Sequence, residues 1–263
     1  MIIIGELING MYKDVDRAIT NKEADIIQHL ALEQVKEGAV VLDVNTGPYS
    51  KNPGDDMKWL VETIQMVVDV PLALDSAKAD VIEGGLKIAK KRAIINSTSA
   101  DPEKMDVIFE LTKRYNTQVI GLTMDKSGVP NNKGKRVELA AAIVAKAIEY
   151  GINTEDLYLD PVLLPLNVAQ AQGLEVLESI REFRLLCDPA PQTTFGLSNL
   201  SQGTHEVRSL VNRTFLAMAI ANGLTSVILD PLDKKLMDAL ITAELFLNKQ
   251  IYCDSFLDAY RKK

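Results

Sequence analysis

Short runs rich in β-branched residues alternate with longer segments of helical period, and this alternation constrains the fold more than any other feature. The runs are apolar on both faces, as strands are when helices cover one side and a packed barrel interior covers the other. Successive runs begin roughly 20 to 40 residues apart, about the size of one βα unit. The predicted strands lie near 1–8, 40–46, 71–76, 92–98, 117–124, 157–165, 193–199 and 226–231.

Amphipathic helices are predicted between the strands, most clearly over 14–37, 136–150 and 210–222. Eight βα alternations within 263 residues predict an α/β fold, a single (β/α)8 TIM barrel that occupies residues 1–263 as one domain. The alternative is a doubly wound open sheet. Such a sheet usually carries a G-x-G-x-x-G turn after its first strand, and the segment GELING at 5–10 lacks that spacing.

Composition narrows the class of partner and the compartment. The net charge is −7 and the charges are interleaved, which argues against a surface for nucleic acid or for an anionic membrane. The sequence contains no signal peptide and no apolar run of about 18 residues, so we expect a cytoplasmic protein. The two cysteines, Cys187 and Cys253, lie far apart and are expected to be buried; with only two histidines, no bound metal is expected.

Nearly every predicted strand closes on an acid or an amide. In a β/α barrel the carboxyl ends of the strands converge on one mouth, where ligands bind. Any one of these side chains could equally cap a helix or begin a turn, but a whole ring of them favours a polar pocket. The residues are Glu6, Asn9, Asp43, Asn45, Asp75, Asn96, Asp160, Asn199 and Asp230.

The types of residue in this ring restrict the chemistry. It lacks a histidine set for a metal, a serine or cysteine paired with histidine, and a lysine placed for a Schiff base. Carboxylates accept hydrogen bonds and amides both donate and accept them. A 2-amino-4-oxo-pyrimidine edge presents adjacent N–H donors, which one carboxylate can meet with two parallel bonds. The ring therefore predicts a receptor for a flat, polar heterocycle.

Longer motifs carry a resemblance to a known family. The chain resembles, essentially end to end, the methyltetrahydrofolate:corrinoid/iron–sulfur protein methyltransferases. More distantly it resembles the folate module of cobalamin-dependent methionine synthase and dihydropteroate synthase. Taken singly, GLSN and INST are the most specific. The motifs are GELINGM, DVNTGP, LALDS, INSTSA, IGLTMDKSGVP, YLDPVLLPLNVAQ, FGLSNLSQ, NRTFLAMAIANGL and QIYCDSF.

The resemblance implies a role for each matching residue. Asp75, Asn96 and Asp160 would hold the pterin by its polar edge, and Asn199 would reach N5 of the folate as the catalytic residue. The remaining residues expected at the substrate are Glu6, Met124, Lys126, Ser198 and Gln202.

Two departures from the family pattern accompany these matches. Leu7 stands where the family's first motif usually has arginine, and Arg208 follows in a loop one residue longer than the family's.

The resemblance also implies the reaction. The methyl group on N5 passes to a Co(I) centre, and N5 takes on negative character as its bond breaks, so a hydrogen bond from Asn199 would stabilise the transition state. An amide cannot deliver a proton, so solvent must, while Asp75 and Asp160 fix orientation. Methyltetrahydrofolate or tetrahydrofolate is the substrate, and a partner protein supplies the corrinoid. The direction of transfer and the pathway, acetyl-CoA synthesis or an O- or N-demethylation system, stay open.

Several weaker signals allow two interpretations. Lys126 could contact the pterin or the glutamate tail, or could serve only a turn before Gly128. His205, after the seventh strand, could touch substrate or be a solvated loop residue. The helix over 210–222 is apolar on more than one side, and the relatives are dimers, so a homodimer is expected.

Two rival functions remain. Dihydropteroate synthase needs basic residues for pyrophosphate at the later strand ends, where this chain has Asp230 and Pro231. A folate-binding scaffold without turnover would have no need to keep Asn199.

Overall fold

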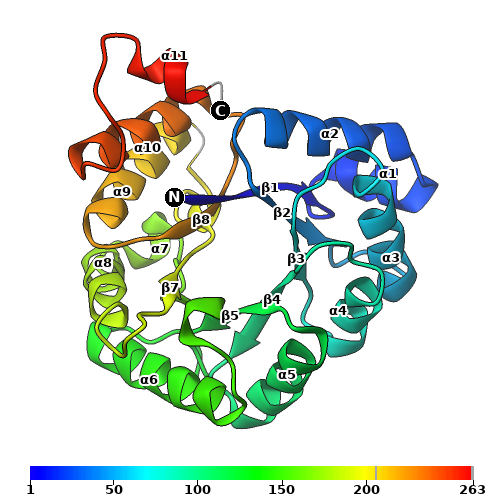
Figure 1. Ribbon diagram of the computed structural model, residues 1–263, viewed down its shortest axis with the longest axis horizontal. Coiled ribbons are helices and arrows are strands. Elements are labelled where there is room, and N and C mark those ends of the chain that lie inside the picture. Colours follow the sequence, from blue (N-terminus) through cyan, green and yellow to red (C-terminus); the bar gives the residue numbers. More distant parts are fainter. Residues whose placement is uncertain (205, 262–263) are drawn as a thin grey trace.

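Parallel strands form a closed ring surrounded by helices in the computed structural model, which describes residues 1–204 and 206–261 (Figure 1). The strands neighbour one another in the order β7-β6-β5-β4-β3-β2-β1-β8, and every strand pair in this sheet is parallel. The predicted TIM barrel is confirmed. The strands are β1 (Ile2–Asn9), β2 (Val41–Asn45), β3 (Leu72–Asp75), β4 (Ile94–Ser99), β5 (Gln118–Leu122), β6 (Leu157–Asp160), β7 (Gln192–Thr193) and β8 (Ser226–Leu229).

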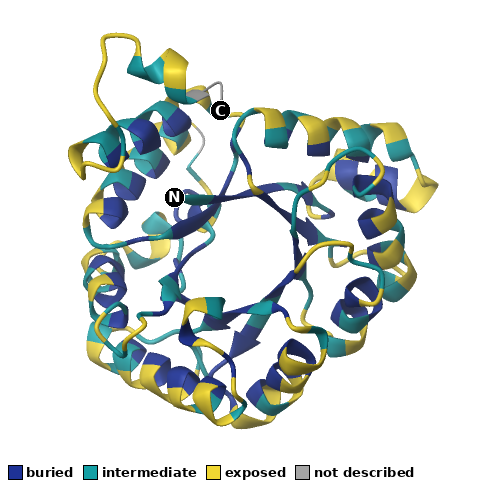
Figure 2. Ribbon diagram, viewed as in Figure 1, coloured by how far each residue is buried: buried dark blue, intermediate teal, exposed yellow. Residues whose placement is uncertain are grey.

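Helices cover the outside of the ring, with their buried faces toward the strands and their exposed faces toward solvent (Figure 2). They are α1 (Lys13–Asn21), α2 (Ala24–Lys36), α3 (Pro53–Ile64), α4 (Ala79–Leu86), α5 (Pro102–Tyr115), α6 (Lys133–Glu149), α7 (Leu166–Ala169), α8 (Gln172–Phe183), α9 (Arg208–Ala221), α10 (Lys234–Phe246) and α11 (Phe256–Arg261).

The helix predicted over 14–37 is wrong as one element, because the chain breaks it into α1 and α2. Lys22 adopts a left-handed conformation with φ of 57°, and its N–H bonds back to the last turn of α1. Its side chain is held by Asp56, with Nζ 2.5 Å from Oδ1, and lies 4.7 Å from the centre of the Trp59 ring. The apolar period continues through the break, so the sequence pattern conceals it.

The seventh strand is much shorter than the predicted 193–199. After Thr193 the chain makes only an isolated parallel bridge between Gly196 and Ile228, and Ile228 donates its N–H to the Phe195 carbonyl over 3.0 Å. Residues Leu197–Asn199 then form a 3-10 turn. The ring is therefore closed between β7 and β8 by this bridge, and the GLSN motif lies in a turn rather than in a strand.

An apolar layer fills the bottom of the barrel interior. It takes one side chain from each of the strands other than β7, and these side chains form one hydrophobic cluster against which Ile2 and Leu122 also pack. A much larger apolar core lies between the strands and the helices. The interior layer consists of Ile4, Val41, Ala73, Ile94, Ile120, Tyr158 and Ile228.

Neither cysteine is fully buried, although Cys187 packs against the large core between strands and helices. Cys187 is only partly buried and Cys253 is exposed, so the expectation that both are buried is wrong. Both lie in segments outside the barrel strands, where the chain connects α8 to β7 and α10 to α11.

Candidate functional site at the barrel mouth

The polar ring lies directly above the interior apolar layer. Side chains alternate between the two faces of a strand, so the residue two positions after each interior residue again points into the barrel. This step leads from Ile4 to Glu6, from Ala73 to Asp75 and from Tyr158 to Asp160. The full second layer is Glu6, Asp43, Asp75, Asn96, Leu122, Asp160 and Asp230.

Two amides of the polar ring bond to two of its carboxylates. Asn96 donates from Nδ2 to Oδ1 of Asp43 over 2.9 Å, and Asn45 donates from Nδ2 to Oδ2 of Asp75 over 2.6 Å. The strand register places Asp75 beside both Asn45 and Asn96. Two carboxylates and two amides from three adjacent strands therefore form one connected cluster. The sequence placed Asp43 in the polar ring but did not name it among the residues that hold the pterin.

Burial shapes the ionisation of these acids. The pKa of Asp43 is raised well above its ordinary value, first by burial and then by the neighbouring Asp75, against the hydrogen bond from Asn96. Burial likewise raises the pKa of Asp75, opposed by the bond from Asn45. Asp160, on the opposite side of the ring, has a pKa of about 7, because burial outweighs the Val162 N–H and the charge of Arg136. Such carboxyls change protonation easily when N–H donors arrive.

A second cluster joins the first strand to the loop after the seventh. The Ser198 hydroxyl donates to Oε1 of Glu6 over 2.5 Å, and Arg208 donates from Nη2 to the same hydroxyl over 2.9 Å. The pKa of Glu6 is raised to about 7, mainly by burial and to a smaller extent by the charge of Asp230, against the lowering effects of the Ser198 hydrogen bond and the Arg208 charge. The structure thus ties two of the expected substrate residues, Glu6 and Ser198, to each other.

The residues expected closest to the reacting atom lie in the same loop. Asn199 is exposed at the end of the 3-10 turn, and Gln202 is exposed in the next turn, where its N–H donates to the Asn199 carbonyl over 3.3 Å. No described residue bonds to the Asn199 amide group. Gly196 allows the close return of this turn, because a Cβ there would lie 3.2 Å from Nδ2 of Asn199. The Asn199 side chain therefore directly follows Ser198, which bonds to Glu6 of the ring, and it is exposed and open to a ligand.

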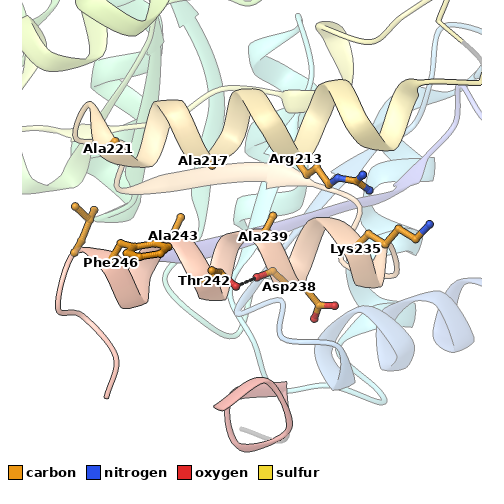
Figure 3. A pocket seen from close by; sticks show the side chains of 10 residues that line it. Arg213, Ala217, Ala221, Lys235, Asp238, Ala239, Thr242, Ala243 and Phe246 are labelled. Atoms are coloured by element: carbon orange, nitrogen blue, oxygen red, sulfur yellow. Dashed lines mark hydrogen bonds between the residues drawn. The ribbon is translucent and has the colours of Figure 1, made fainter. Parts of the chain in front are cut away.

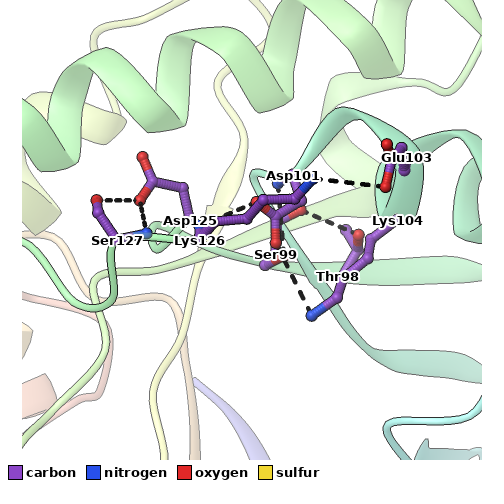
Figure 4. A network of polar contacts seen from close by, with 8 residues as sticks. All are labelled: Thr98, Ser99, Asp101, Glu103, Lys104, Asp125, Lys126 and Ser127. Atoms are coloured by element: carbon purple, nitrogen blue, oxygen red, sulfur yellow. Dashed lines mark hydrogen bonds and ion pairs between the residues drawn. The ribbon is translucent and has the colours of Figure 1, made fainter.

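The loop after β5 holds Met124 and Lys126. Figure 4 shows Lys126 with its neighbours Asp125 and Ser127. The backbones of Asp125 and Gly128 bond to each other in a tight turn. Lys126 lies within this turn, as one of the two interpretations of this residue expected. Its N–H donates to Oδ1 of the buried Asp101 over 3.0 Å, while its ammonium is 73% exposed and lies 3.5 Å from Glu103. Met124 is partly buried, and its carbonyl accepts the Ala100 N–H over 2.8 Å.

Turn formation accounts for some of the strand-end residues, as the sequence allowed. Asn9 accepts from the Met11 N–H through Oδ1, and Asp230 accepts from the Leu232 N–H, each over 2.9 Å. Asn45 takes part in both a turn and the polar cluster. Its Oδ1 accepts the Gly47 N–H over 2.7 Å, and its Nδ2 donates to Asp75. His205 lies outside the described residues.

In residues 1–204 and 206–261, no three His, Cys, Asp or Glu side chains are grouped so as to hold a metal ion. Across the same ranges, no helix is both long and apolar enough to cross a membrane. Asp75 also lines an open hollow of about 520 Å³ between the loops that follow β2 and β3, which gives a ligand access to the ring from solvent.

Comparison with known proteins agrees with this geometry. Residues 13–230 match the family described as "Pterin binding enzyme". The chain is 30% identical to a methylcorrinoid:tetrahydrofolate methyltransferase of Eubacterium limosum, over all of this chain and 97% of that protein. It is 30% identical to the methionine synthase of Mycobacterium leprae and 28% identical to that of Mycobacterium tuberculosis. Those matches cover 87% of this chain and only 20% of each synthase.

Among solved structures, the chain superimposes on a dihydropteroate synthase of Xanthomonas albilineans in complex with 7,8-dihydropteroate, with a TM-score of 0.68 and 18% identity. That match covers 95% of this chain and 94% of the other. A dihydropteroate synthase of Yersinia pestis with a pterin–sulfa conjugate gives a TM-score of 0.66 and 16% identity, covering 94% of each chain. At these identities the likeness concerns the fold.

Proposed function

Because the chain belongs to the family of pterin-binding enzymes, we propose that it binds a folate at the barrel mouth and moves the N5 methyl group between methyltetrahydrofolate and the corrinoid of a partner protein. The relative from Eubacterium limosum, a methylcorrinoid:tetrahydrofolate methyltransferase, matches across the whole chain. The observation that carries the proposal is the single layer of carboxylates and amides inside the mouth, with the free amide of Asn199 beside it.

The carboxylates receive the pterin in this proposal. Asp75 or Asp160 meets the adjacent N–H donors of the 2-amino-4-oxo-pyrimidine ring with two parallel hydrogen bonds, and Asn96 contributes a carbonyl or an amino group to the same edge. Their pKa values lie above the ordinary range because of burial, and donors that replace the lost water favour the ionised form. Binding therefore fixes the ring in one orientation over the apolar layer.

Asn199 acts on the reacting atom. As the methyl group leaves, N5 gains electron density, and an amide N–H at that position stabilises the change more than it stabilises the ground state. Gln202, on the neighbouring turn, and Ser198, bonded to Glu6, hold the loop around it. The corrinoid, held by the partner, supplies the cobalt that accepts or donates the methyl group. The same residues serve transfer in either direction.

Dihydropteroate synthesis is the second candidate, since solved synthases share the fold. That reaction releases pyrophosphate, which needs positive charge at the later strand ends. Here β8 is followed by Asp230, whose carboxylate lies near Glu6 and Asp233, so the local charge opposes an anion. Arg208 is the one described cation that the contacts place at this point, and it is already engaged with Ser198.

A spectroscopic assay tests the proposal. The protein is mixed with methyltetrahydrofolate and reduced cobalamin, and loss of the Co(I) absorbance is followed. Enzyme-dependent loss supports methyl transfer. Folate binding without spectral change would indicate a scaffold without turnover, and formation of dihydropteroate from a pterin pyrophosphate and p-aminobenzoate would indicate the synthase.

We also propose a homodimer formed through the outer face of α9 and α10. A groove of about 680 Å³ runs between these helices, floored by Ala217, Ala221, Ala239 and Ala243 (Figure 3). At one end of it Phe246 is 82% exposed. Small residues allow a second helix pair to approach closely, and an exposed aromatic side chain supplies apolar area for burial.

We place the protein in the cytoplasm. Both cysteines are free in the structure, and the exposed Cys253 is suited to a reducing compartment.

A further inference from the structure

Arg136 lies in the first turn of α6 and is among the largest side chains that are completely buried. Its exposed fraction is 0%. It is not a member of the polar ring, and the sequence assigns it only to an amphipathic helix. A guanidinium in the interior loses its hydration and must be compensated by hydrogen bonds or by opposite charge. The contacts that compensate this buried charge therefore indicate what Arg136 does in the structure.

Arg136 is bound by backbone and amide oxygens rather than by a carboxylate. Nε donates to the carbonyl of Pro161 over 2.8 Å, and Nη2 donates to Oε1 of Gln172 over 2.7 Å. Gln172 is in turn fixed by the Asn131 side chain over 3.1 Å. The remaining nitrogen, Nη1, is buried and has no hydrogen-bond partner among the described residues. One of the two anchors of this arginine is therefore the carbonyl of Pro161, the residue that directly follows Asp160.

The turn at Pro161 and Val162, to which Arg136 donates a hydrogen bond, contains a strained residue. Val162 adopts a left-handed conformation with φ of 62°, which is strongly disfavoured for a β-branched residue. In this conformation the Val162 N–H points back and donates to Oδ1 of Asp160 over 2.6 Å. A strained residue persists only where its surroundings hold it, and the bond from Arg136 to the Pro161 carbonyl lies immediately before it.

We infer that Arg136 is a positioning residue for the pterin: by holding the Pro161 carbonyl it keeps Val162 left-handed and so keeps the Asp160 carboxylate turned into the barrel. The inference rests on the proposed function in taking Asp160 as a ligand of the pterin. Arg136 does not touch the ligand, and it acts through the turn. Its effect should appear in the affinity for folate rather than in the methyl-transfer step.

The charge of Arg136 contributes in the same direction. It lowers the pKa of Asp160, against the larger effect of burial. The other charged group that faces Arg136 is Glu175 of α8, which is also bound by the Lys133 N–H over 2.6 Å. Lysine at position 136 would keep the charge but would lose the planar pair of donors that reaches Pro161 and Gln172 together. The geometric and the electrostatic contributions can therefore be separated.

Two variants and one control test the inference. Arg136→Met removes both contributions, and Arg136→Lys retains the charge. Arg92→Met is the matched control. Arg92 also donates from Nε to a backbone carbonyl, that of Asn116 over 2.9 Å, but it precedes β4 and lies at the opposite end of the barrel. Tetrahydrofolate affinity is measured by calorimetry from pH 6 to 8.5. The Asp160 carboxyl is titrated by ¹³C NMR without ligand and assigned with Asp160→Asn.

We expect Arg136→Met to weaken tetrahydrofolate binding about tenfold or more and to raise the pKa of Asp160. Arg136→Lys should weaken binding while leaving that pKa close to the wild-type value, and Arg92→Met should change neither. Unchanged affinity and titration in a folded Arg136→Met, or equal changes in Arg92→Met, would overturn the inference. Should Arg136→Met fail to fold, wild-type affinity in Arg136→Lys would overturn it instead.

The same measurements distinguish a failure of this inference from a failure of the proposed function. Wild-type protein would then bind no folate, whereas the ligand-free titration of Asp160 would still show whether Arg136 controls that carboxyl.

Discussion

Asn45 donates from its amide Nδ2 to Oδ2 of Asp75 over 2.6 Å, while its own Oδ1 accepts the Gly47 N–H over 2.7 Å. The backbone of the loop therefore sets which way the amide faces, and the amide holds one oxygen of the carboxylate. No described residue donates to the other oxygen of Asp75. One half of this carboxylate is anchored to the protein, and the other half is available to a ligand.

Asp75→Asn should weaken tetrahydrofolate binding by about 10- to 100-fold, because an amide cannot accept two parallel N–H bonds and leaves a buried donor unpaired. The dissociation constant is measured by calorimetry. Asp156→Asn is the control, since Asp156 also bonds to a donor pair, that of Arg92, but at the far end of the barrel. Equal affinity in Asp75→Asn and wild type would remove Asp75 from the site.

Asn199→Ala should slow methyl transfer by about 100-fold or more, the usual cost of one donor at a developing charge. The Asn199 side chain is exposed and has no described partner, so the free energy of unfolding should change by less than about 0.5 kcal/mol. Single-turnover loss of the Co(I) absorbance reports the rate. The exposed amide of Asn153, which precedes β6 at the opposite end, provides Asn153→Ala as the control. A wild-type rate in Asn199→Ala would refute the role.

Stability should depend on pH through Asp160. Its pKa is raised from 3.8 to about 7, so the folded state binds its proton more tightly than the unfolded state. This contribution is complete below about pH 4 and is lost as the pH rises through 7. Between pH 5 and pH 8, wild type should lose roughly 2 kcal/mol more than Asp160→Asn. Urea unfolding at both pH values measures the difference, and parallel losses in the two proteins would contradict it.

The barrel could be predicted from the sequence because strand and helix periods differ and the eight βα units follow one another without interruption. The polar ring could be predicted because each acid or amide lies in the carboxyl-terminal part of a predicted strand or directly after it. Asp43 is predicted only as one member of this ring, and its place beside Asp75 follows from its standing two residues after the interior Val41, as Asp75 stands after Ala73. That spacing is visible only once the interior layer is known.

Other features depend on contacts that periodicity does not encode. The break at Lys22 depends on Asp56 and Trp59, which lie far away in the sequence. The shortened β7 follows from the turn at Leu197–Asn199. Arg136 has the spacing of an ordinary helix residue, and only its bond to Pro161 connects it with Asp160.

Lys126→Ala should leave the affinity for tetrahydrofolate with a single glutamate unchanged, because the ammonium is exposed beside Glu103 while the backbone N–H keeps its bond to Asp101. A surface pair of this kind contributes little to stability, about 0–1 kcal/mol. Affinity is compared for folates with one and with several glutamates, with Lys104→Ala, from the adjoining helix, as the control. A selective loss for the longer tail in Lys126→Ala would instead assign Lys126 to the glutamate tail.

Phe246→Glu should convert the proposed dimer to a monomer. The change places a charge in the apolar contact between two copies of the α9–α10 face, where an unpaired charge is costly to bury. Light scattering after size exclusion should give twice 28.9 kDa for wild type and about 28.9 kDa for the variant. Met66→Glu is the control, because Met66 is 72% exposed and follows α3, away from the groove.

Folate affinity should be equal in all three proteins, since the groove lies on the outer helices while the ring opens at the carboxyl ends of the strands. A monomeric wild type, or a dimer that survives in Phe246→Glu, would show that this face is not the interface.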